Sequence, residues 1–560
     1  MNNAEIAEHF ALLSRLMDIH GENSFKSKTY SIAAFHIEKL EQPLADTERA
    51  SIASIKGLGP AVAAKIAELL DTGSMAALQQ LLDNTPAGVR EMLRIKGLGP
   101  KKIHTVWQEM GIQSIGELEY ACNENRLTRY KGFGAKTQAN VLEAIQFYNQ
   151  HAGHFLYAQI EPLFPTVQQY LEQMFGAGNV LPTGDYRRQL LTLHELEFVV
   201  SADKAAIKPK FQTAYPPELL EETDDYIVYK LTNGLKLKLL LAKGNIYARQ
   251  FLTSASDAFL ESFWAHAAPT NLEKENFVSE TDIFKKANLA FIPPYYRETA
   301  TAVQQAAANN LPKMIELADI KGIIHNHSNW SDGVNTIEEL ARELISHNFE
   351  YLVMSDHSKT AAYANGLSED RIREQHLYID QLNQQLAPFK IFKSIESDIL
   401  NDGSLDYSDD ILRSFDLVIA SVHSNLYMNE EKAMQRLLKA IGNPFTTILG
   451  HPTGRLLLSR NGYPLNHEKI IDACAANHVV IEINANPHRL DLDWSWIDYA
   501  MQKNVLLSIN PDAHSIEGLS DIKYGVLAAQ KGGLTAHFNL SSFTLSEFEA
   551  YLKKTKAAKI

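Results

Sequence analysis

Apolar residues in the first 150 positions recur at helical spacing. The segments "AEIAEHFALLSRLMDI" (4–19) and "AVAAKIAELLDTG" (61–73) repeat apolar side chains every three or four residues, as amphipathic helices do. After residue 151 the strand-like runs "HELEFVVSA" and "LKLKLLLA" stand between helical stretches. From about residue 316, short β-branched runs alternate with helix-like segments. This alternation predicts β/α units around a parallel sheet or barrel.

The same patterns predict a multidomain chain. The expected domains are an all-α region in two parts, an α+β region in two parts, and a C-terminal α/β barrel. Their predicted boundaries are 1–80, 81–150, 151–262, 263–315 and 316–560. The fourth segment contains "FIPPYYRE" (291–298), which the two prolines fix as a turn.

Charge is spread unevenly over the 560 residues. The net charge is -14, and residues 1–150 contribute 16 Lys+Arg against 17 Asp+Glu, so the other 410 residues carry -13. A phosphate-binding surface is therefore expected in the N-terminal part. Two cysteines, Cys122 and Cys474, exclude a disulfide scaffold and a thiolate zinc site. Without a signal peptide or an apolar run of membrane-spanning length, we expect a cytoplasmic protein with no membrane partner.

Three glycine hairpins recur in the helical region: "IKGLGPAVAAKI", "IKGLGPKKIHTV" and "YKGFGAKTQANV". Each Gly-apolar-Gly allows a tight turn and a close approach of the backbone. The following helix directs free N–H groups at the turn, where a phosphate binds well. The pattern predicts helix-hairpin-helix motifs that hold DNA by its backbone rather than by its bases. The candidate DNA-binding residues are Lys56, Gly57, Gly59, Lys96, Gly97, Gly99, Lys131, Gly132 and Gly134.

Histidines and carboxylates close the apolar runs of the C-terminal region. In "IIHNHSNWSDG" the i, i+2 spacing puts two histidines on one face of a strand end. In a β/α barrel the C-terminal ends of the strands converge on one mouth. The predicted metal ligands are His325, His327, Asp332, His357, Glu396, His423, His451, Asp512 and His514. So many convergent groups suit several divalent ions such as Zn²⁺, Mn²⁺ or Fe²⁺, which bind phosphate and acidify a water.

Residues 316–560 resemble the PHP (polymerase and histidinol phosphatase) domain. The phrases "HNHSNWSDG", "SDHS", "IASVHS", "GHPTGR", "EINANPHRLDL" and "INPDAH" follow the motifs of that family in order. The resemblance implies a distorted TIM-like barrel with a trinuclear metal centre, and all nine ligand positions carry over. Arg455 and Arg489 lie in family motifs near the site, and their fork geometry makes them candidate catalytic phosphate clamps.

The whole chain resembles bacterial family X DNA polymerases with a C-terminal PHP domain. "SFKSKTYSIAAFHI" is similar to their N-terminal DNA-binding subdomain, "IPPYYRE" to their thumb signature, and "GDYRR…HELEFVV" to their palm motif. In that family three aspartates hold two Mg²⁺ ions. Here Glu195 and Glu197 replace two of them, Lys238 stands in place of the third, and Asp185 replaces a phosphate-binding serine. The departures predict a degenerate polymerase site that no longer transfers nucleotides.

One further position carries over from relatives that cleave 5′-deoxyribose phosphate. Their Schiff-base lysine aligns with Lys65 in "AVAAKIAELL", but a supporting lysine position is Ala61 in this chain. Lys65 is therefore a lyase candidate, with a solvated helical lysine as the alternative.

These features predict a DNA-binding phosphoesterase with three bound divalent metals. By resemblance, its activity is 3′→5′ exonuclease and end processing in DNA repair. The expected partner is DNA with gaps, nicks or single-stranded ends, and the expected state is a monomer. Two alternatives stay open: a small-molecule phosphatase of the histidinol-phosphate type, and a non-catalytic DNA-binding scaffold. The hairpins argue against the first and the complete ligand set against the second.

Overall fold

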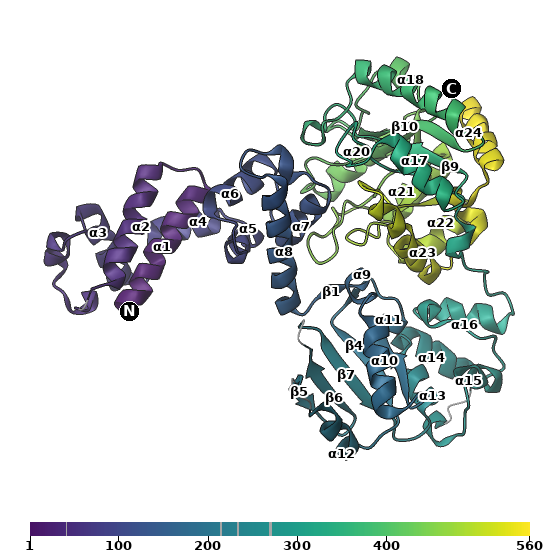
Figure 1. The fold of residues 1–560 in the computed structure, drawn as a ribbon, viewed down its shortest axis with the longest axis horizontal. Coiled ribbons are helices and arrows are strands. Elements are labelled where there is room, and N and C mark those ends of the chain that lie inside the picture. The colour runs from purple at the N-terminus through teal and green to yellow at the C-terminus, as the bar shows by residue number, and fades with distance from the viewer. Residues whose placement is uncertain (41, 213–215, 232–233, 268–270, 560) are drawn as a thin grey trace. The chain divides into compact units, whose positions relative to one another are not determined.

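The computed structural model describes residues 1–40, 42–212, 216–231, 234–267 and 271–559 (Figure 1). The chain forms two compact units, Met1–Tyr148 and Asn149–Ile560. No helix among these residues is both long enough and apolar enough to cross a membrane.

The first unit is entirely helical, as the apolar spacing predicted. Its apolar core includes Phe10, Ile66 and Val106, none of which is exposed. The N-terminus of α1 is fixed by a capping box in which Asn2 and Glu5 satisfy each other's backbone N–H groups. The helices are α1 (Asn3–Ile19), α2 (Ser24–Glu38), α3 (Pro60–Thr72), α4 (Ala76–Asp83), α5 (Ala87–Glu91), α6 (Pro100–His104), α7 (Ile115–Asn123) and α8 (Ala135–Ala152).

The second unit begins with a mixed five-stranded sheet and its helices. We call this region the palm. The strand order is β2-β4-β7-β6-β5, and only the β4–β7 pair is parallel. The predicted strand-like runs form β4 and β7. The palm elements are β1 (Phe155–Leu156), α9 (Tyr157–Ile160), α10 (Phe164–Phe175), β2 (Val180–Thr183), α11 (Gly184–Arg187), β3 (Thr192–Leu193), β4 (Glu195–Val200), α12 (Lys204–Ile207), β5 (Glu218–Glu222), β6 (Tyr226–Lys230) and β7 (Lys236–Leu241).

A helical segment follows the palm and has its own aromatic core. Phe251, Phe263 and Phe284 are buried there, and their rings contact one another edge to face or tilted. The turn in "FIPPYYRE" is a short 3₁₀ helix, Pro294–Tyr296. The helices of this segment are α13 (Ile246–Thr253), α14 (Asp257–His266), α15 (Glu280–Lys286) and α16 (Ala300–Ala307).

The C-terminal part is a parallel seven-stranded sheet with helices outside it. The strand order β14-β13-β12-β11-β10-β9-β8 follows the chain, as the β/α alternation predicted. His327 N donates to the carbonyl of Ala513 at 2.9 Å, and a parallel bridge joins Asn326 to Ala513. These contacts join the two edge strands just beyond their C-terminal ends, so the sheet is a nearly closed, distorted barrel.

The strands of this barrel are short and almost wholly buried. Its elements are β8 (Gly322–Ile323), α17 (Ile337–Ser346), β9 (Tyr351–Met354), α18 (Glu369–Leu386), β10 (Lys390–Asp398), α19 (Asp409–Leu412), β11 (Leu417–Ser421), α20 (Glu430–Ile441), β12 (Thr446–Leu449), α21 (His467–Asn477), β13 (Val480–Asn484), α22 (Ile497–Gln502), β14 (Leu507–Asn510), α23 (Ile522–Lys531) and α24 (Leu545–Lys559).

Candidate metal centre and nucleic-acid interface

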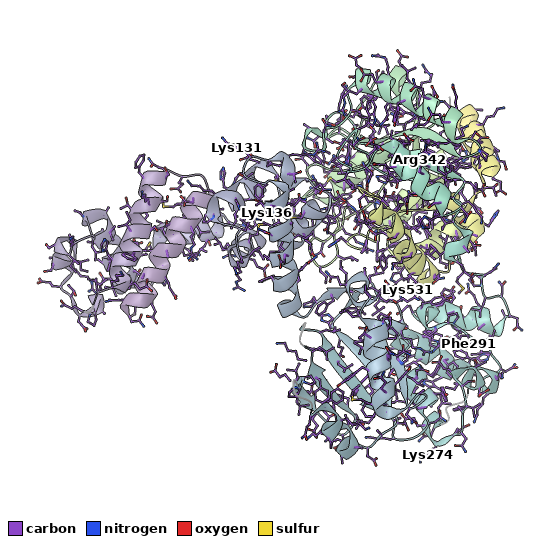
Figure 2. The ribbon with its side chains drawn as sticks, in the orientation of Figure 1. Lys131, Lys136, Lys274, Phe291, Arg342 and Lys531 are labelled. Atoms are coloured by element: carbon purple, nitrogen blue, oxygen red, sulfur yellow. The ribbon has the colours of Figure 1, made fainter. Side chains whose placement is uncertain are left out.

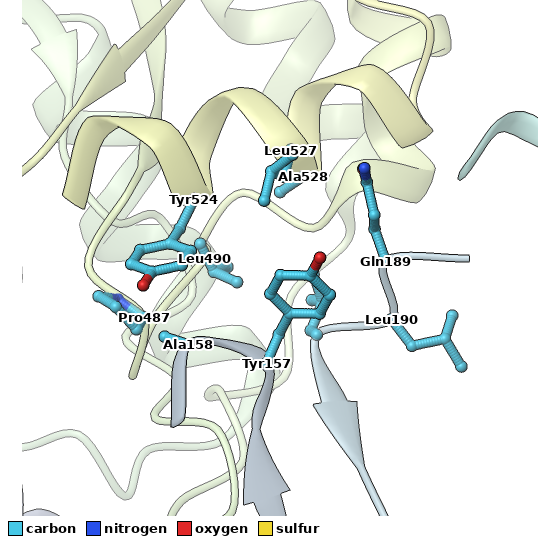
Figure 3. A pocket seen from close by; sticks show the side chains of 10 residues that line it. Tyr157, Ala158, Gln189, Leu190, Pro487, Leu490, Tyr524, Leu527 and Ala528 are labelled. Atoms are coloured by element: carbon cyan, nitrogen blue, oxygen red, sulfur yellow. The ribbon is translucent and has the colours of Figure 1, made fainter. Parts of the chain in front are cut away.

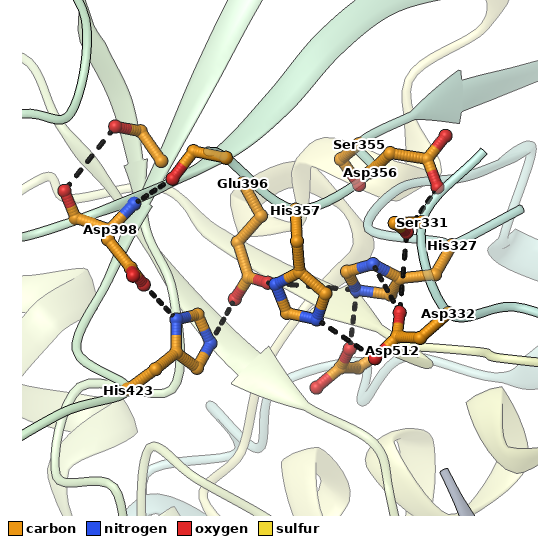
Figure 4. A network of polar contacts seen from close by, with 12 residues as sticks. His327, Ser331, Asp332, Ser355, Asp356, His357, Glu396, Asp398, His423 and Asp512 are labelled. Carbon is orange, nitrogen blue, oxygen red and sulfur yellow. Dashed lines mark hydrogen bonds and ion pairs between the residues drawn. The ribbon is translucent and has the colours of Figure 1, made fainter. Parts of the chain in front are cut away.

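The nine predicted ligands come together at the C-terminal ends of the barrel strands. Eight of them follow β8, β9, β11, β12 or β14, whereas Glu396 lies inside the longer strand β10. Their side chains are buried or nearly so. The barrel therefore brings residues from separate strand ends into one polar cluster (Figure 4).

Eight of the nine residues form three groups whose candidate ligand atoms lie within 4.8 Å of one another. His327 belongs to two of these groups, and so does His357. The ninth residue, His451, places Nε2 3.0 Å from Glu396 Oε1. The groups are His327 with Asp332, His357 and His514; His325 with His327 and Asp512; and His357 with Glu396 and His423. This donor set of imidazoles and carboxylates is the type that holds borderline divalent ions.

Glu396 is the centre of the cluster. Its carboxylate faces His325 Nε2 at 3.2 Å, His357 Nδ1 at 2.9 Å, His423 Nε2 at 3.1 Å and His451 Nε2 at 3.0 Å. Burial by itself would raise the pKa of Glu396, but the facing histidines, His423 foremost, hold that pKa well below its usual range. The carboxylate is therefore ionised, which is the form that ligates metal.

Stacked imidazoles surround His327. The rings of His357 and His514 lie 4.3 and 4.2 Å from it, centroid to centroid. Burial, followed by the two neighbouring histidines, lowers the pKa of His327 to about 3. The ring is neutral at ordinary pH, and neutral imidazole is the form that binds metal.

Buried atoms in the cluster fit the predicted ions. Among the described residues, His327 Nδ1 and His451 Nδ1 are buried without a hydrogen-bond partner. Buried polar atoms normally have a partner, and each exception needs an explanation such as a bound ion. Divalent ions within reach of these atoms would supply it.

Backbone conformation also singles out this site. The ligands His325, His451 and Asp512 have φ values of +65°, +22° and +53°. Residues with a Cβ rarely adopt positive φ, and they keep it where the surroundings over-determine it, often at functional sites. The barrel thus holds three ligands against the ordinary preference of their backbones.

The sequence interpretation missed the carboxylates that support the ligands. Glu482, fully buried in β13, lies 2.6 Å from His325 Nδ1 and accepts the backbone N–H of His451 at 2.7 Å. Asp398 contacts His423 Nδ1 in the same way. Such partners orient metal-binding imidazoles and raise their basicity. A glutamate inside the apolar run "VVIEIN" was the available signal for Glu482.

The two candidate clamp arginines have different surroundings. Arg489 is 6% exposed, and its Nε lies 3.7 Å from Asp512 Oδ2, so the structure brings it to the ligand cluster. Arg455 donates from Nε to the carbonyl of Arg489 at 2.9 Å, from Nη2 to the carbonyl of Leu490, and from Nη1 to Asp493 at 2.6 Å. These partners occupy much of the Arg455 guanidinium group. The geometry therefore favours Arg455 as a residue that supports the loop carrying Arg489. A direct phosphate contact by either arginine stays a prediction.

The three predicted hairpins have one geometry. Gly57, Gly97 and Gly132 have φ values of +92°, +84° and +96°, which glycine adopts without strain. In each turn a buried residue (Leu58, Leu98 or Phe133) donates its N–H to the carbonyl three residues before it, at 3.0 to 3.1 Å. The glycines and the preceding lysines are exposed.

Cationic side chains surround the third hairpin. Lys131 precedes its glycines and Lys136 stands in the first turn of α8, and both are exposed (Figure 2). Added Cβ atoms at Gly97, Gly99, Gly132 and Gly134 would meet nothing within 4 Å. The glycines therefore leave the backbone accessible, as phosphate contact requires.

Lys65, the lyase candidate, is half-buried in α3, with its Nζ 6.0 Å from the centre of the Tyr30 ring.

In the palm, Lys238 forms ion pairs with the two glutamates of the polymerase-like motif. Lys238 pairs in register with Glu197 across β7 and β4. Its Nζ lies 2.8 Å from Glu195 Oε1 and 3.4 Å from Glu197 Oε1. Glu197 also accepts the backbone N–H of Asp185 at 3.1 Å. The Lys238 ammonium group thus pairs with Glu195 and Glu197, the carboxylates that the sequence resemblance aligns with metal-binding aspartates.

Two arginines next to Asp185 also have carboxylate partners. Arg187 makes a two-pronged pair with Glu280 at 2.7 and 2.8 Å, and Arg188 makes another with Glu298 at 3.0 and 2.5 Å. In the structure they join the palm to the helical segment that follows it.

Two family models match the helical unit. A helix-hairpin-helix domain matches residues 1–75, and a SAM-like helix-hairpin-helix tandem matches residues 89–146. The first match includes the hairpin at Gly57, and the second includes those at Gly97 and Gly132. The helix-hairpin-helix assignment from the sequence is therefore confirmed.

Relatives of the barrel are phosphatases by name. A probable phosphatase of Thermoanaerobacter sp. (strain X514) is 25% identical over 247 residues, covering 41% of this chain and 94% of its own length. A probable phosphatase of Acetivibrio thermocellus is 26% identical over 167 residues, covering 29% of this chain and 63% of its own length.

Together, the fold and the site define a multidomain protein in which helix-hairpin-helix motifs and a palm-like sheet are joined to a PHP-type barrel with a metal-ligand cluster. One relative matches this whole arrangement. The DNA polymerase/3′-5′ exonuclease PolX of Bacillus subtilis (strain 168) is 31% identical over 574 residues, covering 99% of this chain and 100% of its own length. The chain belongs to the PolX family.

Proposed function

We propose that this protein is a DNA-binding, metal-dependent phosphoesterase that removes nucleotides from 3′ ends, and that it no longer polymerises DNA. The observation that carries the proposal is the meeting of all nine predicted ligands in one buried cluster. The name of the Bacillus subtilis relative includes 3′-5′ exonuclease, which supports the direction of cutting. The hairpins support DNA as the substrate.

The nine cluster residues are proposed to hold three divalent ions, Mn²⁺, Zn²⁺ or Fe²⁺. Bound there, such ions would supply Lewis-acid stabilisation of phosphoryl oxygens and lower the pKa of a water. Glu482 and Asp398 orient the ligating imidazoles of His325 and His423. Arg489, beside Asp512, is proposed to bind a phosphate oxygen with its planar fork.

We propose the domain boundaries 1–80, 81–150, 151–262, 263–315 and 316–560, a monomeric state and a cytoplasmic location. Lys65 stays a lyase candidate.

The decisive experiment removes and restores the metal. Full-length protein is stripped with a chelator, dialysed, and given Mn²⁺, Zn²⁺ or Fe²⁺ with end-labelled single-stranded, nicked and gapped DNA. We expect hydrolysis only with added metal, releasing mononucleotides from the 3′ end. Phosphate release from histidinol phosphate with all DNA left intact would favour the small-molecule alternative. DNA binding without hydrolysis of either substrate would favour the scaffold.

The hairpins give a second prediction. Changing Gly97 and Gly99 to Val should weaken DNA binding roughly tenfold, about 1.4 kcal/mol, because the side chains block the approach of a phosphate. Binding is measured by fluorescence anisotropy at several salt concentrations, since counterion release makes it salt-dependent.

Gly111→Val is the matched control for backbone strain. Gly111 also has positive φ, +71°, and open space around its Cβ position, but it lies outside the hairpins. Hydrolysis of a small chromogenic phosphodiester should be the same for all variants. Equal DNA affinity in the hairpin variant and the unchanged protein would contradict backbone binding by this motif.

A further inference from the structure

The loop that carries Arg489 has a strained backbone. It follows β13, and its next residue, Leu490, has φ +43° and is only 4% exposed. A leucine in this region costs on the order of 1–3 kcal/mol and persists only where the surroundings impose it. Something must therefore hold residues 486–493 in the conformation that places Arg489 beside Asp512.

Part of that support comes from the barrel. Arg455 donates to the carbonyls of Arg489 and Leu490. Thr453 donates from its backbone N and its hydroxyl to Asp491 Oδ2, at 3.0 and 2.9 Å. These bonds hold two backbone carbonyls of the loop and the Asp491 carboxylate, but they do not hold the side chain of Leu490.

Helix α23 of the barrel and the palm together supply the packing. Leu490 forms a buried cluster with Tyr524 and Ala528 of α23, and the palm residues Tyr157, Ala158 and Leu191 pack against this cluster (Figure 3). The same residues line a small cavity between the palm and the barrel. The palm thus lies against the cluster that contains Leu490, the direct neighbour of Arg489.

The palm side of this contact is held in a fixed position. The Tyr157 ring stacks on Tyr186 with centroids 5.0 Å apart and planes 8° apart, and Tyr186 stacks on Phe164 at 4.2 Å. The Tyr157 N–H also bonds to the carbonyl of Leu191 at 3.1 Å. A stacked ring with a fixed backbone can transmit position, whereas a mobile surface side chain cannot.

Helix α23 is tied to the palm side at both ends. Near its start, Lys523 Nζ and the Tyr524 hydroxyl bond Glu161 at 2.8 and 3.0 Å. At its end, the buried Lys531 bonds Glu298 at 2.9 Å and the carbonyl of Arg188 at 2.8 Å. Arg188 and Glu298 are the partners already described next to the degenerate polymerase site.

We propose that the palm acts as a buttress for the metal centre: Tyr157, through Leu490, positions Arg489 for phosphoester hydrolysis. Tyr157 is a positioning residue, because it touches neither the ligand cluster nor a substrate. The inference rests on the proposed function of the metal centre. It assigns the degenerate palm a present task in hydrolysis.

The test is a double-mutant cycle in the full-length protein. Tyr157→Ala should lower kcat for bis(4-nitrophenyl) phosphate with Mn²⁺ about tenfold, since small misplacements of catalytic groups are costly. KM and bound metal should change little. In an Arg489→Ala background the same change should cost nothing further, because coupled residues are not additive. Tyr157→Phe, which keeps the ring, should retain kcat.

Tyr229→Ala is the matched control. Tyr229 is a buried palm tyrosine stacked on Phe211 at 4.4 Å, and it is not part of the Leu490 cluster. An equal loss of kcat in this variant would mean that general palm damage explains the effect, and would overturn the proposal. So would an unchanged kcat in Tyr157→Ala, or an equal loss in the Arg489→Ala background.

Amide hydrogen exchange separates this inference from the proposed function. Exchange over residues 486–493 should accelerate in Tyr157→Ala but not in Tyr229→Ala or Tyr157→Phe. If the unchanged protein hydrolyses no phosphoester, the proposed function fails, and this measurement still decides whether the palm holds the loop. Unchanged exchange in Tyr157→Ala would refute the buttress.

Discussion

Changing His325 and His327 together to alanine should abolish phosphoester hydrolysis and lower the amount of bound metal. The two residues reach two of the three ligand groups, and His327 belongs to both of them. Changes to supporting residues around a metal site typically cost 10–100-fold, so removing two ligands should cost more than about 10²-fold. Activity on DNA and on a small phosphodiester should fall together, because both depend on the same centre.

Metal content is measured by mass spectrometry after dialysis, beside the hydrolysis rates. His347→Ala is the control, since that histidine lies at the end of α17 with its side chain 62% exposed. Thermal melts with and without metal show whether the double variant is folded, and Asp332→Asn offers a ligand change of nearly the same shape. Full activity with unchanged metal content in the double variant would remove the metal centre from the proposal.

Primer extension should be absent, even when the nuclease is disabled so that it cannot mask synthesis. The polymerase reaction needs two divalent ions between a triphosphate and carboxylates on adjacent strands. Here the Lys238 ammonium bonds Glu195 and lies 3.4 Å from Glu197, so a cation of the protein occupies the anionic site. Burial raises the pKa of Glu197, with Lys238 opposing this effect. Asp185 adds a carboxylate where the triphosphate would lie.

The measurement uses the His325→Ala, His327→Ala background with a labelled primer and template, dNTPs and either Mg²⁺ or Mn²⁺. No product longer than the primer is expected. Lys238→Ala in that background tests whether the ion pair alone blocks the site; we expect no extension there either, because Asp185 remains. Clear extension that disappears when Glu195 and Glu197 are changed to Ala would show that the palm still catalyses synthesis.

The contact between palm and barrel includes a charged residue of the polymerase-like motif, Arg188. Arg188 and Glu298 bond each other, and Lys531 of the barrel bonds Glu298. A buried charge that loses its partner typically costs 3–5 kcal/mol. Arg188, Glu298 and Lys531 therefore join three parts of the second unit.

The sequence by itself determined the features that have a local signature. The hairpins follow from Gly-apolar-Gly turns, because few other residues adopt the φ of Gly57, Gly97 and Gly132. The barrel follows from the alternation of apolar runs and helices, and the ligand set from polar residues at the ends of those runs. The sequence also showed Glu195, Glu197 and Lys238 in place of the aspartates of the palm motif, and strand pairing brings Lys238 beside Glu197.

Only the tertiary structure decided which polar groups pair over long distances. Glu482 supports His325 across 157 residues, and Lys531 reaches Glu298 across 233. The Arg455 fork is engaged by a loop 34 to 38 residues further on, which its motif did not reveal. The physical reason is that a charged side chain has many possible partners, and the choice depends on burial and geometry that the completed fold creates. The packing of Tyr157 against the Leu490 cluster also depends on the completed fold. The spacing of apolar residues predicts which side chains are buried, but it does not predict which distant loop they will contact.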